Sequence, residues 1–357
     1  MDEQTQNSTQ QSQETVAERL KPSMVIWPIL FGLIGVGIML WREMRGGMPA
    51  EPLTLAPHWW LYALLVILCM FCKDYSGMYR LRVMAGVPLN FRQLYRIRML
   101  YEFTSAVTPS VAGGSSLEVL FIHREGIKIS RATSMTLLAV FMDELLMIVL
   151  FPILLLIIPY SDLFTAEGYF QYGFLWAFII GYAVKFVWVT ILFIGLFFKQ
   201  KVFTWLIGGL SSIKFLKRYR KRMLTTAVEI KQCAQEIRHQ TASYWIKMAF
   251  STIGIWSFRF MIANMAIMIF NSLNGMQNLI CFARQYILGI VCTIVPTPGG
   301  SGFAEVMFDG FLGEFINQPM SAVVIAFIWR LATYYYYLVA GVVILPQWLG
   351  KSKLFKK

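Results

Sequence analysis

Two short stretches rich in helix-breaking residues decide the fold of this sequence. They are "VTPSVAGGSSLE", residues 107–118, and "VPTPGGSGFAE", residues 295–305. Each contains Thr-Pro, then Gly-Gly-Ser, then a glutamate, and each lies within apolar sequence. Proline and glycine are unfavourable inside a helix. The two interruptions therefore have to be explained together with their apolar flanks.

The composition indicates a membrane protein. Of the 357 residues, 57% are hydrophobic and only 14% are charged, against about 25% charged residues in a typical soluble domain. The formal net charge is +13, but the basic residues collect in loops beside apolar segments, as positive-inside topology signals do. We therefore predict an all-α polytopic protein of the cell membrane, of the bacterial cytoplasmic-membrane type, that contacts lipid and not nucleic acid.

The apolar segments predict six full transmembrane helices. A hydrocarbon core about 30 Å thick requires about 20 apolar residues in a helix. The segments that meet this requirement are residues 24–41, 59–79, 132–158, 172–198, 248–270 and 321–346. Two further apolar stretches, 99–122 and 279–316, contain the interruptions.

The distribution of Lys and Arg predicts the orientation, because cytoplasmic loops carry an excess of these residues. The basic connections are residues 73–98, 123–131, 199–247 and 351–357, whereas residues 159–171 and 271–278 contain no Lys or Arg. We expect a disordered cytoplasmic tail (1–22), a transmembrane domain (23–350) with a basic cytoplasmic helical segment (199–247), and a basic cytoplasmic tail (351–357). Both termini then lie in the cytoplasm.

This orientation constrains the two interrupted stretches. Both flanks of residues 99–122 are cytoplasmic, so this stretch enters and leaves the membrane by the same face. The stretch 279–316 follows an external connection and enters from the opposite face. We therefore predict two oppositely oriented re-entrant helical hairpins, arranged like an inverted repeat, whose tips approach each other near the middle of the membrane. The alternative is a pair of Pro/Gly kinks within ordinary membrane helices.

The residues at the two tips suit an anion. Proline ends the descending arm, glycine lets the backbone turn, and serine caps the ascending half-helix. The N-terminus of that half-helix offers unpaired N–H groups and a partial positive charge, which favour phosphate. The predicted binding residues are Thr108, Pro109, Gly113, Gly114, Ser115 and Glu118 at the first tip, and Pro298, Gly299, Gly300, Ser301 and Glu305 at the second.

Charged residues within the apolar segments support a binding site, because each costs about 2.5 to 3.5 kcal/mol at the centre of a membrane helix. The cations are Lys185, Arg259, Arg284 and Arg330, and the anions near the middle of their helix are Asp143 and Glu144. We predict that Arg284 and Arg330 bind phosphate, because a guanidinium group offers a bidentate fork. The alternative is that these charges form ion pairs that only hold the helices together.

The same acids are candidates for energy coupling. The sequence contains no P-loop motif for ATP, so transport would depend on a lipid gradient or an ion gradient. A carboxyl group desolvated in the membrane has a raised pKa and can carry a proton. The possible coupling acids are Glu118, Asp143 and Glu144, with Glu118 the first candidate because it lies just beyond a predicted half-helix tip.

Four stretches of the sequence resemble a known family. The stretches "TPSVAGGSSLEVLFIHREGI" (108–127), "DE" (143–144), "VPTPGGSGFAE" and "WRLATYYYYLVAG" (329–341) resemble the membrane region of lysylphosphatidylglycerol synthases, the flippase-like domain family. In that family the membrane region is implicated in moving aminoacylated phospholipid between leaflets, and a separate soluble domain performs aminoacyl transfer. The resemblance implies that the tip residues and Arg330 form the site. Because the chain ends soon after its last predicted span, we expect the membrane module without the synthase activity.

Three classes of function are compatible with these features. The first is a flippase for a phospholipid or a polyprenyl-phosphate-linked lipid, without cofactor or metal, for which a homodimer is an open alternative to a monomer. The second is an ion-coupled transporter of a small solute, which an inverted repeat also permits. The third is a membrane enzyme that uses Glu118, or Asp143 with Glu144, as acid and base. The sequence lacks a nucleophile–base signature, so we predict transport and no enzymatic activity.

Overall fold

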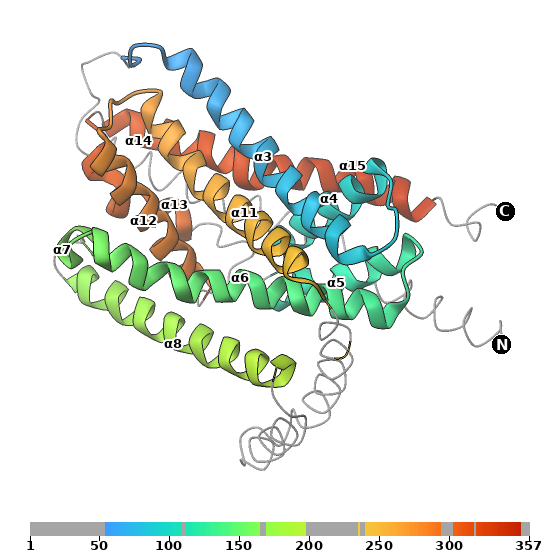
Figure 1. The fold of residues 1–357 in the computed structure, drawn as a ribbon. Helices are drawn as coiled ribbons and strands as arrows, with labels where there is room; N and C mark the ends of the chain where they lie inside the picture. Colours follow the sequence, from blue (N-terminus) through green and yellow to red (C-terminus); the bar gives the residue numbers. More distant parts are fainter. Residues whose placement is uncertain are drawn as a thin grey trace, which may run out of the picture.

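The computed structural model describes residues 54–108, 111–164, 169–197, 235, 240–293, 303–317 and 319–350. These residues form helices joined by short connections, with no strand among them (Figure 1). In chain order the helices are α3 (Trp59–Ala85), α4 (Phe91–Val107), α5 (Val111–Arg124), α6 (Ile129–Ile157), α7 (Tyr160–Leu163), α8 (Tyr169–Phe197), α11 (Ala242–Met268), α12 (Gly275–Cys292), α13 (Phe303–Leu312), the 3₁₀-helix η3 (Gly313–Phe315), α14 (Pro319–Arg330), the π-helix η4 (Leu331–Tyr335) and α15 (Tyr336–Gly350).

The prediction of an all-α polytopic membrane protein is confirmed. Within the described part of the chain, five helical segments are long and apolar enough to cross a membrane. They are Trp59–Ala85, Ile129–Ile157, Gly173–Phe197, Ala242–Met268 and Ser321–Trp348. Each corresponds to a predicted span, and the remaining predicted span, residues 24–41, lies outside the described residues, as do the predicted tails.

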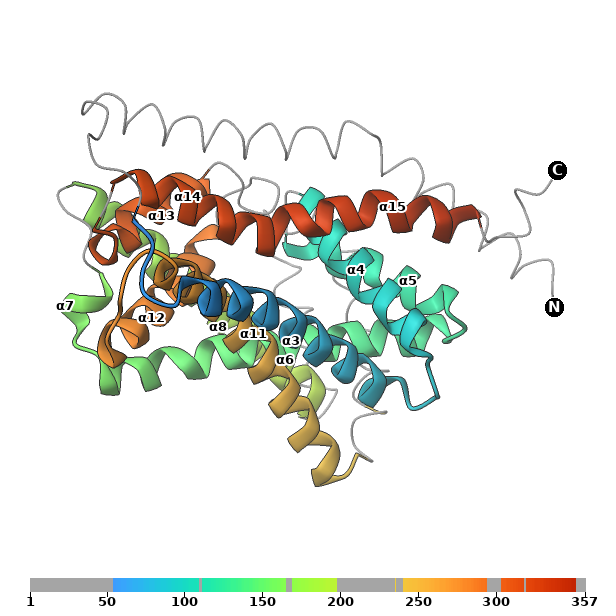
Figure 2. The same ribbon diagram turned by 90° about the horizontal axis from the view of Figure 1, so that it is seen from above.

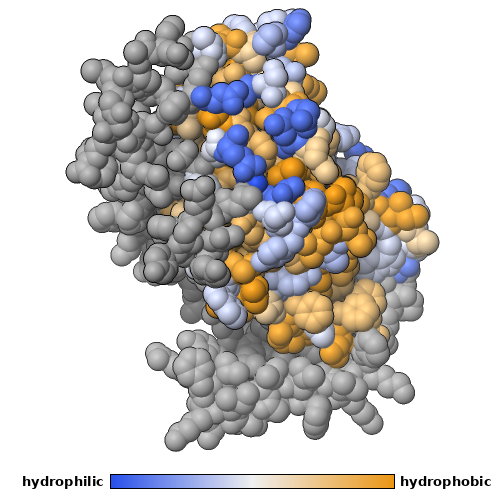
Figure 3. Space-filling model, turned by 90° about the vertical axis from the view of Figure 1, so that its left-hand side faces the viewer, coloured by the Kyte–Doolittle hydropathy of each residue, from blue (hydrophilic) through white to orange (hydrophobic). Residues whose placement is uncertain are grey.

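The outer faces of these helices are apolar. On α8 the exposed side chains of Trp176, Ile180, Val184 and Val187 recur at intervals of four, four and three residues. This spacing places them on one face of the helix. A water-exposed apolar stripe of this length would be unfavourable, so the face fits contact with lipid tails. Figure 3 views the left-hand side of Figure 1 and shows hydrophilic residues gathered at that end of the molecule beside apolar surface.

The shorter helices form two pairs at opposite ends of the molecule. Figures 1 and 2 show α4 with α5 at one end and α12 with α13 at the other. These helices have 17, 14, 18 and 10 residues, each fewer than the about 20 that a full crossing requires. A re-entrant course through the membrane remains a prediction, but the lengths and the opposite placement agree with it.

The two halves of the fold repeat the same order of elements. The first half runs from the span α3 through the pair α4–α5 to the span α6, and the second from the span α11 through the pair α12–α13 to the span of α14 and α15. Each pair also begins with the same capping box. The backbone N–H of Asn90 donates to the side chain of Gln93 at 2.9 Å, and that of Asn274 donates to Gln277 at 2.9 Å. This box satisfies backbone groups at the start of a helix.

The structure corrects the prediction for residues 73–98, which we expected to form a basic cytoplasmic connection. Helix α3 continues to Ala85 and α4 begins at Phe91. Lys73, Arg80 and Arg98 are buried against neighbouring helices. The prediction of a connection was wrong because buried ion pairs allow a membrane helix to carry charged residues. The side of the membrane on which these residues lie stays a prediction.

The second correction concerns the first tip. Gly113, Gly114 and Ser115 lie inside α5, which begins at Val111, and so form neither the turn nor the helix cap. Gly114 serves close packing instead, because a Cβ atom there would lie 2.1 Å from the Oγ of Ser105 on α4. Pro109, the predicted end of the descending arm, lies outside the described residues.

The predicted boundary of the basic segment 199–247 also changes. Residues 242–247 belong to α11, which begins at Ala242 instead of Met248. The side chain of Thr241 accepts a hydrogen bond from the backbone N–H of Tyr244 and so caps this start. Most of the remaining segment lies outside the described residues.

Candidate functional site

A cavity of about 300 Å³ lies between the two helix pairs and is lined by residues of both. Thr108 and Ser115 of the first pair line it, and so do Thr293 and Ala304 of the second. The full-length helices complete the wall through Arg80 of α3, Val140, Asp143, Glu144 and Met147 of α6, Lys185 of α8, and Ile255, Trp256, Arg259 and Phe260 of α11. Segments that are almost 200 residues apart in the sequence therefore meet at one site.

Helix α6 presents two adjacent acids, Asp143 and Glu144, to the cavity. The guanidinium group of Arg80 binds both carboxylate oxygens of Asp143, with Nη2 3.0 Å from Oδ2. The indole N–H of Trp256 donates to the same carboxylate at 2.9 Å. A bidentate pair with an additional donor satisfies a buried carboxylate well.

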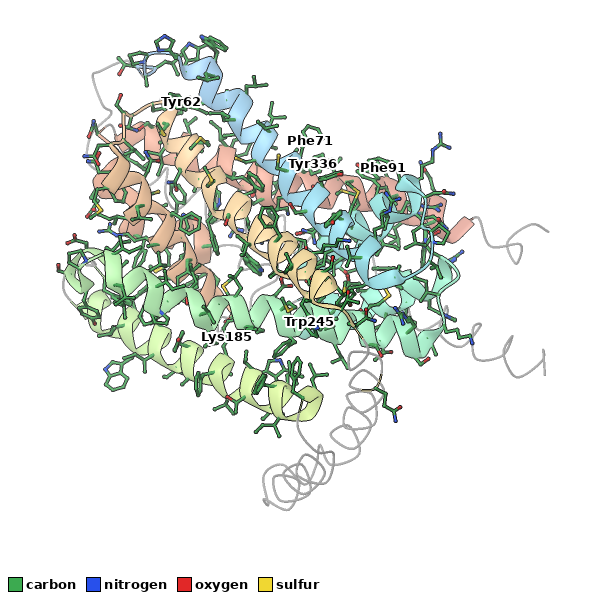
Figure 4. All side chains as sticks on the ribbon, viewed as in Figure 1. Tyr62, Phe71, Phe91, Lys185, Trp245 and Tyr336 are labelled. Carbon is green, nitrogen blue, oxygen red and sulfur yellow. The ribbon has the colours of Figure 1, made fainter. Side chains whose placement is uncertain are left out.

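The second acid of α6 pairs with α8. The ammonium group of Lys185 donates to both carboxylate oxygens of Glu144 at 2.8 and 2.7 Å. In Figure 4, Lys185 is labelled on α8, the helix that runs beside α6. Both side chains are nearly buried, so the pair also fixes α8 against α6 at the depth of the cavity.

Glu102 on α4 is the centre of a larger cluster. It accepts a hydrogen bond from Lys73 at 2.9 Å and another from Arg98, and Nη1 of Arg259 lies 3.5 Å from its Oε2. These three cations come from α3, α4 and α11. One buried carboxylate therefore ties three helices together beside the cavity.

Asp74 extends this cluster to the last span. It lies 3.4 Å from Nε of Arg98 and accepts a hydrogen bond from the hydroxyl of Tyr337 at 2.9 Å. The ring of Tyr337 also lies 4.2 Å from the ammonium group of Lys73, which is a cation–π distance. Gly77 makes room for the cluster, because a Cβ atom there would lie 2.7 Å from Arg98.

Arg330 reaches the cavity from the last span and is buried. Its guanidinium group lies 4.8 Å from the ring of Trp329 and 5.2 Å from the ring of Tyr334. Arg330 is the final residue of α14, and the π-helix η4 begins directly after it. π-helical turns are uncommon and often occur at functional sites. The interrupted helix therefore coincides with a cation at the cavity.

The described side chains give the cavity a positive charge. Those that line it include five cations, Arg80, Arg98, Lys185, Arg259 and Arg330, and three carboxylates, Glu102, Asp143 and Glu144. The difference, five minus three, is a net charge of +2. Charges in a cavity of low polarity interact more strongly than charges in water. This net charge favours an anion over a cation in the cavity.

The predicted site residues separate into groups. Thr108, Ser115, Asp143, Glu144 and Arg330 all line the cavity. Glu118 is buried in α5 and interacts electrostatically with Arg80 and Asp143 on neighbouring helices. The tip residues Pro109, Pro298, Gly299, Gly300 and Ser301 lie outside the described residues, and so does the side chain of Glu305, whose backbone belongs to α13.

Arg284 lies away from the cavity lining. Its guanidinium group donates to the backbone carbonyls of Asp162 at 2.8 Å and Phe311 at 3.0 Å, and it pairs with Glu314 at 2.8 Å. These contacts join α12 to α7 and to the end of α13. Phosphate binding by Arg284 stays a prediction from the sequence, and we leave it out of the proposed site.

Sequence reasoning missed the cations of α3 and α4. Arg80, Arg98 and Lys73 were attributed to a cytoplasmic connection, and Glu102 was not considered. One signal was available, because Lys73, Gly77 and Arg80 follow each other at intervals of four and three residues and so share a face of a helix. The sequence does not indicate which charges on different helices pair with each other.

The chain has identifiable relatives. Residues 25–341 match the family described as the lysylphosphatidylglycerol synthase TM region. A UPF0104 membrane protein from Archaeoglobus fulgidus is 23% identical over 287 residues, which cover 76% of this chain and 80% of the relative. No solved structure matches the chain. Since the family match spans most of the sequence, from before the first described helix into the last span, the chain belongs to the lysylphosphatidylglycerol synthase TM region family.

Proposed function

We propose that this protein is a flippase that moves an anionic lipid with a phosphate-containing headgroup, either a phospholipid or a polyprenyl-phosphate-linked lipid, between the leaflets of a cell membrane. One observation carries the proposal. Two helix pairs from opposite ends of the molecule line one cavity, and its described lining has a net charge of +2. The membership in a lipid-related membrane family agrees with it.

The proposed binding mode assigns the phosphate to two of the cations that line the cavity. Arg330 contacts aromatic rings, and Arg259 lies 3.5 Å from Glu102 with 37% of its side chain exposed. Arg80 and Lys185 are held by bidentate pairs. We therefore assign the phosphate contacts to Arg330 and Arg259, with the N-terminus of α5 supplying partial positive charge beside Thr108.

The proposed transport mechanism follows from the placement of the helix pairs. A headgroup in the cavity has one pair between it and each end of the molecule (Figure 1). Small movements of one pair against the full spans would open the cavity to one side at a time, as in transporters built from inverted repeats. The acyl chains would stay among the lipid tails along the apolar outer faces, so that only the headgroup crosses the polar path.

The ion pairs of the cavity carboxylates favour a transport function over a catalytic one. A general acid or base has to reach the reacting group. Asp143 is engaged by Arg80 and Trp256, and Glu144 by Lys185. We therefore propose that these acids organise the cavity and that the protein is not an enzyme. An ion-coupled transporter of a small soluble anion is the remaining candidate, because the same charges would bind its anionic group.

Reconstitution in proteoliposomes tests the function. With fluorescent phospholipids, we expect the wild-type protein to accelerate exchange between leaflets and Arg330→Gln to slow it at least ten-fold. The matched control is Arg82→Gln, which removes an exposed cation of α3 outside the cavity. If wild-type protein moves a soluble phosphate ester and no lipid, the flippase proposal is wrong and the solute transporter is right.

We further propose that Glu118 couples transport to a proton gradient. It is buried, and of the three candidate acids it alone lies outside the bidentate pairs of α6. An imposed proton gradient should change the rate of lipid exchange several-fold in the wild-type protein and have little effect in Glu118→Gln. Glu314→Gln, at an exposed position, is the control. Coupling through Glu118 is ruled out if the gradient has no effect and Glu118→Gln works at the wild-type rate.

A further inference from the structure

A second hollow lies at the end of the molecule where α4 meets α15. Its volume is about 310 Å³, and it shares no lining residue with the central cavity. The residues that line it are Phe91, Arg92, Tyr95, Arg96, Ile344, Gln347 and Trp348. Figure 4 labels Phe91 and Tyr336 on this side of the molecule. We call this hollow the α4–α15 groove.

The arginines of the groove carry more positive charge than the neighbouring carboxylate neutralises. Arg92 and Arg96 lie one helical turn apart on α4, and Arg92 is exposed. Nη2 of Arg96 is 3.0 Å from a carboxylate oxygen of Glu125. Its Nε atom is buried and has no hydrogen-bond partner among the described residues. The two guanidinium groups of the lining against one carboxylate leave a net charge of +1, and Arg124 beside Trp348 adds a further cation.

Aromatic and apolar side chains form the rest of the groove. The ring of Trp348 is buried, and the guanidinium group of Arg124 lies 4.1 Å from it. The ring of Phe91 is exposed and stacks on Tyr95 with centroids 6.5 Å apart. Aromatic residues beside arginine at the end of a membrane span are typical of the level of the lipid headgroups.

An apolar surface continues from the groove along the last span. Ile344 lines the groove, and Val342 and Val343 are exposed on α15 immediately before it. A soluble anion would use only the arginines. A lipid would use both parts, because its headgroup would meet Arg92 and Arg96 while its acyl chains lie along α15.

We propose that the α4–α15 groove binds the headgroup of an anionic phospholipid from the leaflet at this end of the molecule, separately from the transported lipid in the central cavity. The proposal does not depend on flippase activity. Each basic residue near an anionic surface changes lipid affinity about five-fold. Loss of Arg92 should therefore weaken binding about five-fold, and added negative charge in the groove should weaken it by a similar factor.

The experiment uses the full chain in detergent, titrated with phosphatidylglycerol and observed by native mass spectrometry. Arg92→Gln should lose about five-fold in affinity for one bound lipid, and Gln347→Glu should do the same while both arginines stay. Arg82→Gln is the matched control, and phosphatidylcholine is the matched lipid. Arg330→Gln should affect a different bound lipid, which separates this proposal from the central cavity.

Two results would overturn the proposal. Wild-type affinity in both Arg92→Gln and Gln347→Glu would show that no anionic lipid binds in the groove. Displacement of the lipid by glycerol phosphate at equal concentration would show that the groove recognises a soluble anion. The melting temperature of each variant shows whether it is folded. If Arg92→Gln does not fold, Gln347→Glu still tests the proposal.

Discussion

The sequence predicts phosphate binding for both Arg284 and Arg330, but the two side chains have different surroundings. Arg330 lines the cavity between aromatic rings, whereas Arg284 donates to two backbone carbonyls and pairs with Glu314. A guanidinium group has five donors in a fixed plane and suits either task. At the scale of the residue, the neighbours therefore decide whether a buried arginine is a binding group or a structural group.

We predict that Arg284→Ala lowers stability more than it lowers binding. The substitution leaves the buried carbonyl of Phe311 without this donor, at about 1 to 3 kcal/mol, and removes the donor from the part-buried carbonyl of Asp162. The melting temperature in detergent measures the effect. Glu314→Ala is the matched control, because it removes one partner of Arg284 and leaves both carbonyl contacts in place. An unchanged melting temperature with loss of lipid transport would instead support the phosphate contact predicted from the sequence.

At the scale of the element, small residues let the helices of the site approach each other. Gly114 of α5 faces Ser105 of α4, and Gly77 of α3 faces Arg98 of α4. Membrane helices associate through such close contacts, because apolar surface by itself gives them little reason to prefer each other over lipid. The glycine of the first tip therefore determines how α4 and α5 pack, and through them where Thr108 and Ser115 lie.

We predict that Gly114→Ala destabilises the α4–α5 pair by about 1 to 3 kcal/mol, the usual cost of an overpacked contact. The new Cβ atom would lie 2.1 Å from the Oγ of Ser105. Adding Ser105→Gly should restore part of the stability, because it removes that oxygen. Melting temperatures of the single and double variants measure the coupling. Gly173→Ala is the control, since no atom lies within 4 Å of a Cβ at that position. Equal losses in single and double variants would contradict this account.

At the scale of the whole molecule, the two helix pairs share one cavity. Ser115 and Thr293 line it from the first and second pair. The ion pairs around Glu102 and Asp143 hold α3, α4, α6 and α11 around it. A movement that opens the cavity therefore has to displace one pair against a framework of charged contacts, instead of separating two independent sites.

We predict that cysteines introduced at Ser115 and Thr293 have the same accessibility. In a background without the native cysteines, an impermeant reagent should label both from the same side in a given state, because both face one cavity. An anionic phospholipid at saturating concentration should slow both reactions at least several-fold. Cys281, restored alone in this background, is the third position for comparison, since it is fully buried in α12. Protection of one site without the other would show that the two pairs line separate cavities.

The sequence by itself determined the class of protein and most of the spans. Residues 132–158 and 172–198 are long apolar runs, and a run of about 20 apolar residues has one stable arrangement in a bilayer because its backbone must satisfy its own hydrogen bonds. The interrupted stretches were equally visible, since proline and glycine act on the local backbone. The order of elements and the involvement of Arg330 follow from such local signals.

The tertiary structure decided which charges belong to the site. Lys73, Arg80 and Arg98 look like loop residues in the sequence, and only their contacts with Glu102 and Asp143 place them beside the cavity. Likewise, only the contact with Ser105 shows that Gly114 serves packing and not a turn. The physical reason is that the free energy of a buried charge depends on its partner, and the partner lies on another helix. Helix formation in a membrane is a local property of the chain, whereas the pairing of buried charges is a property of the assembled bundle.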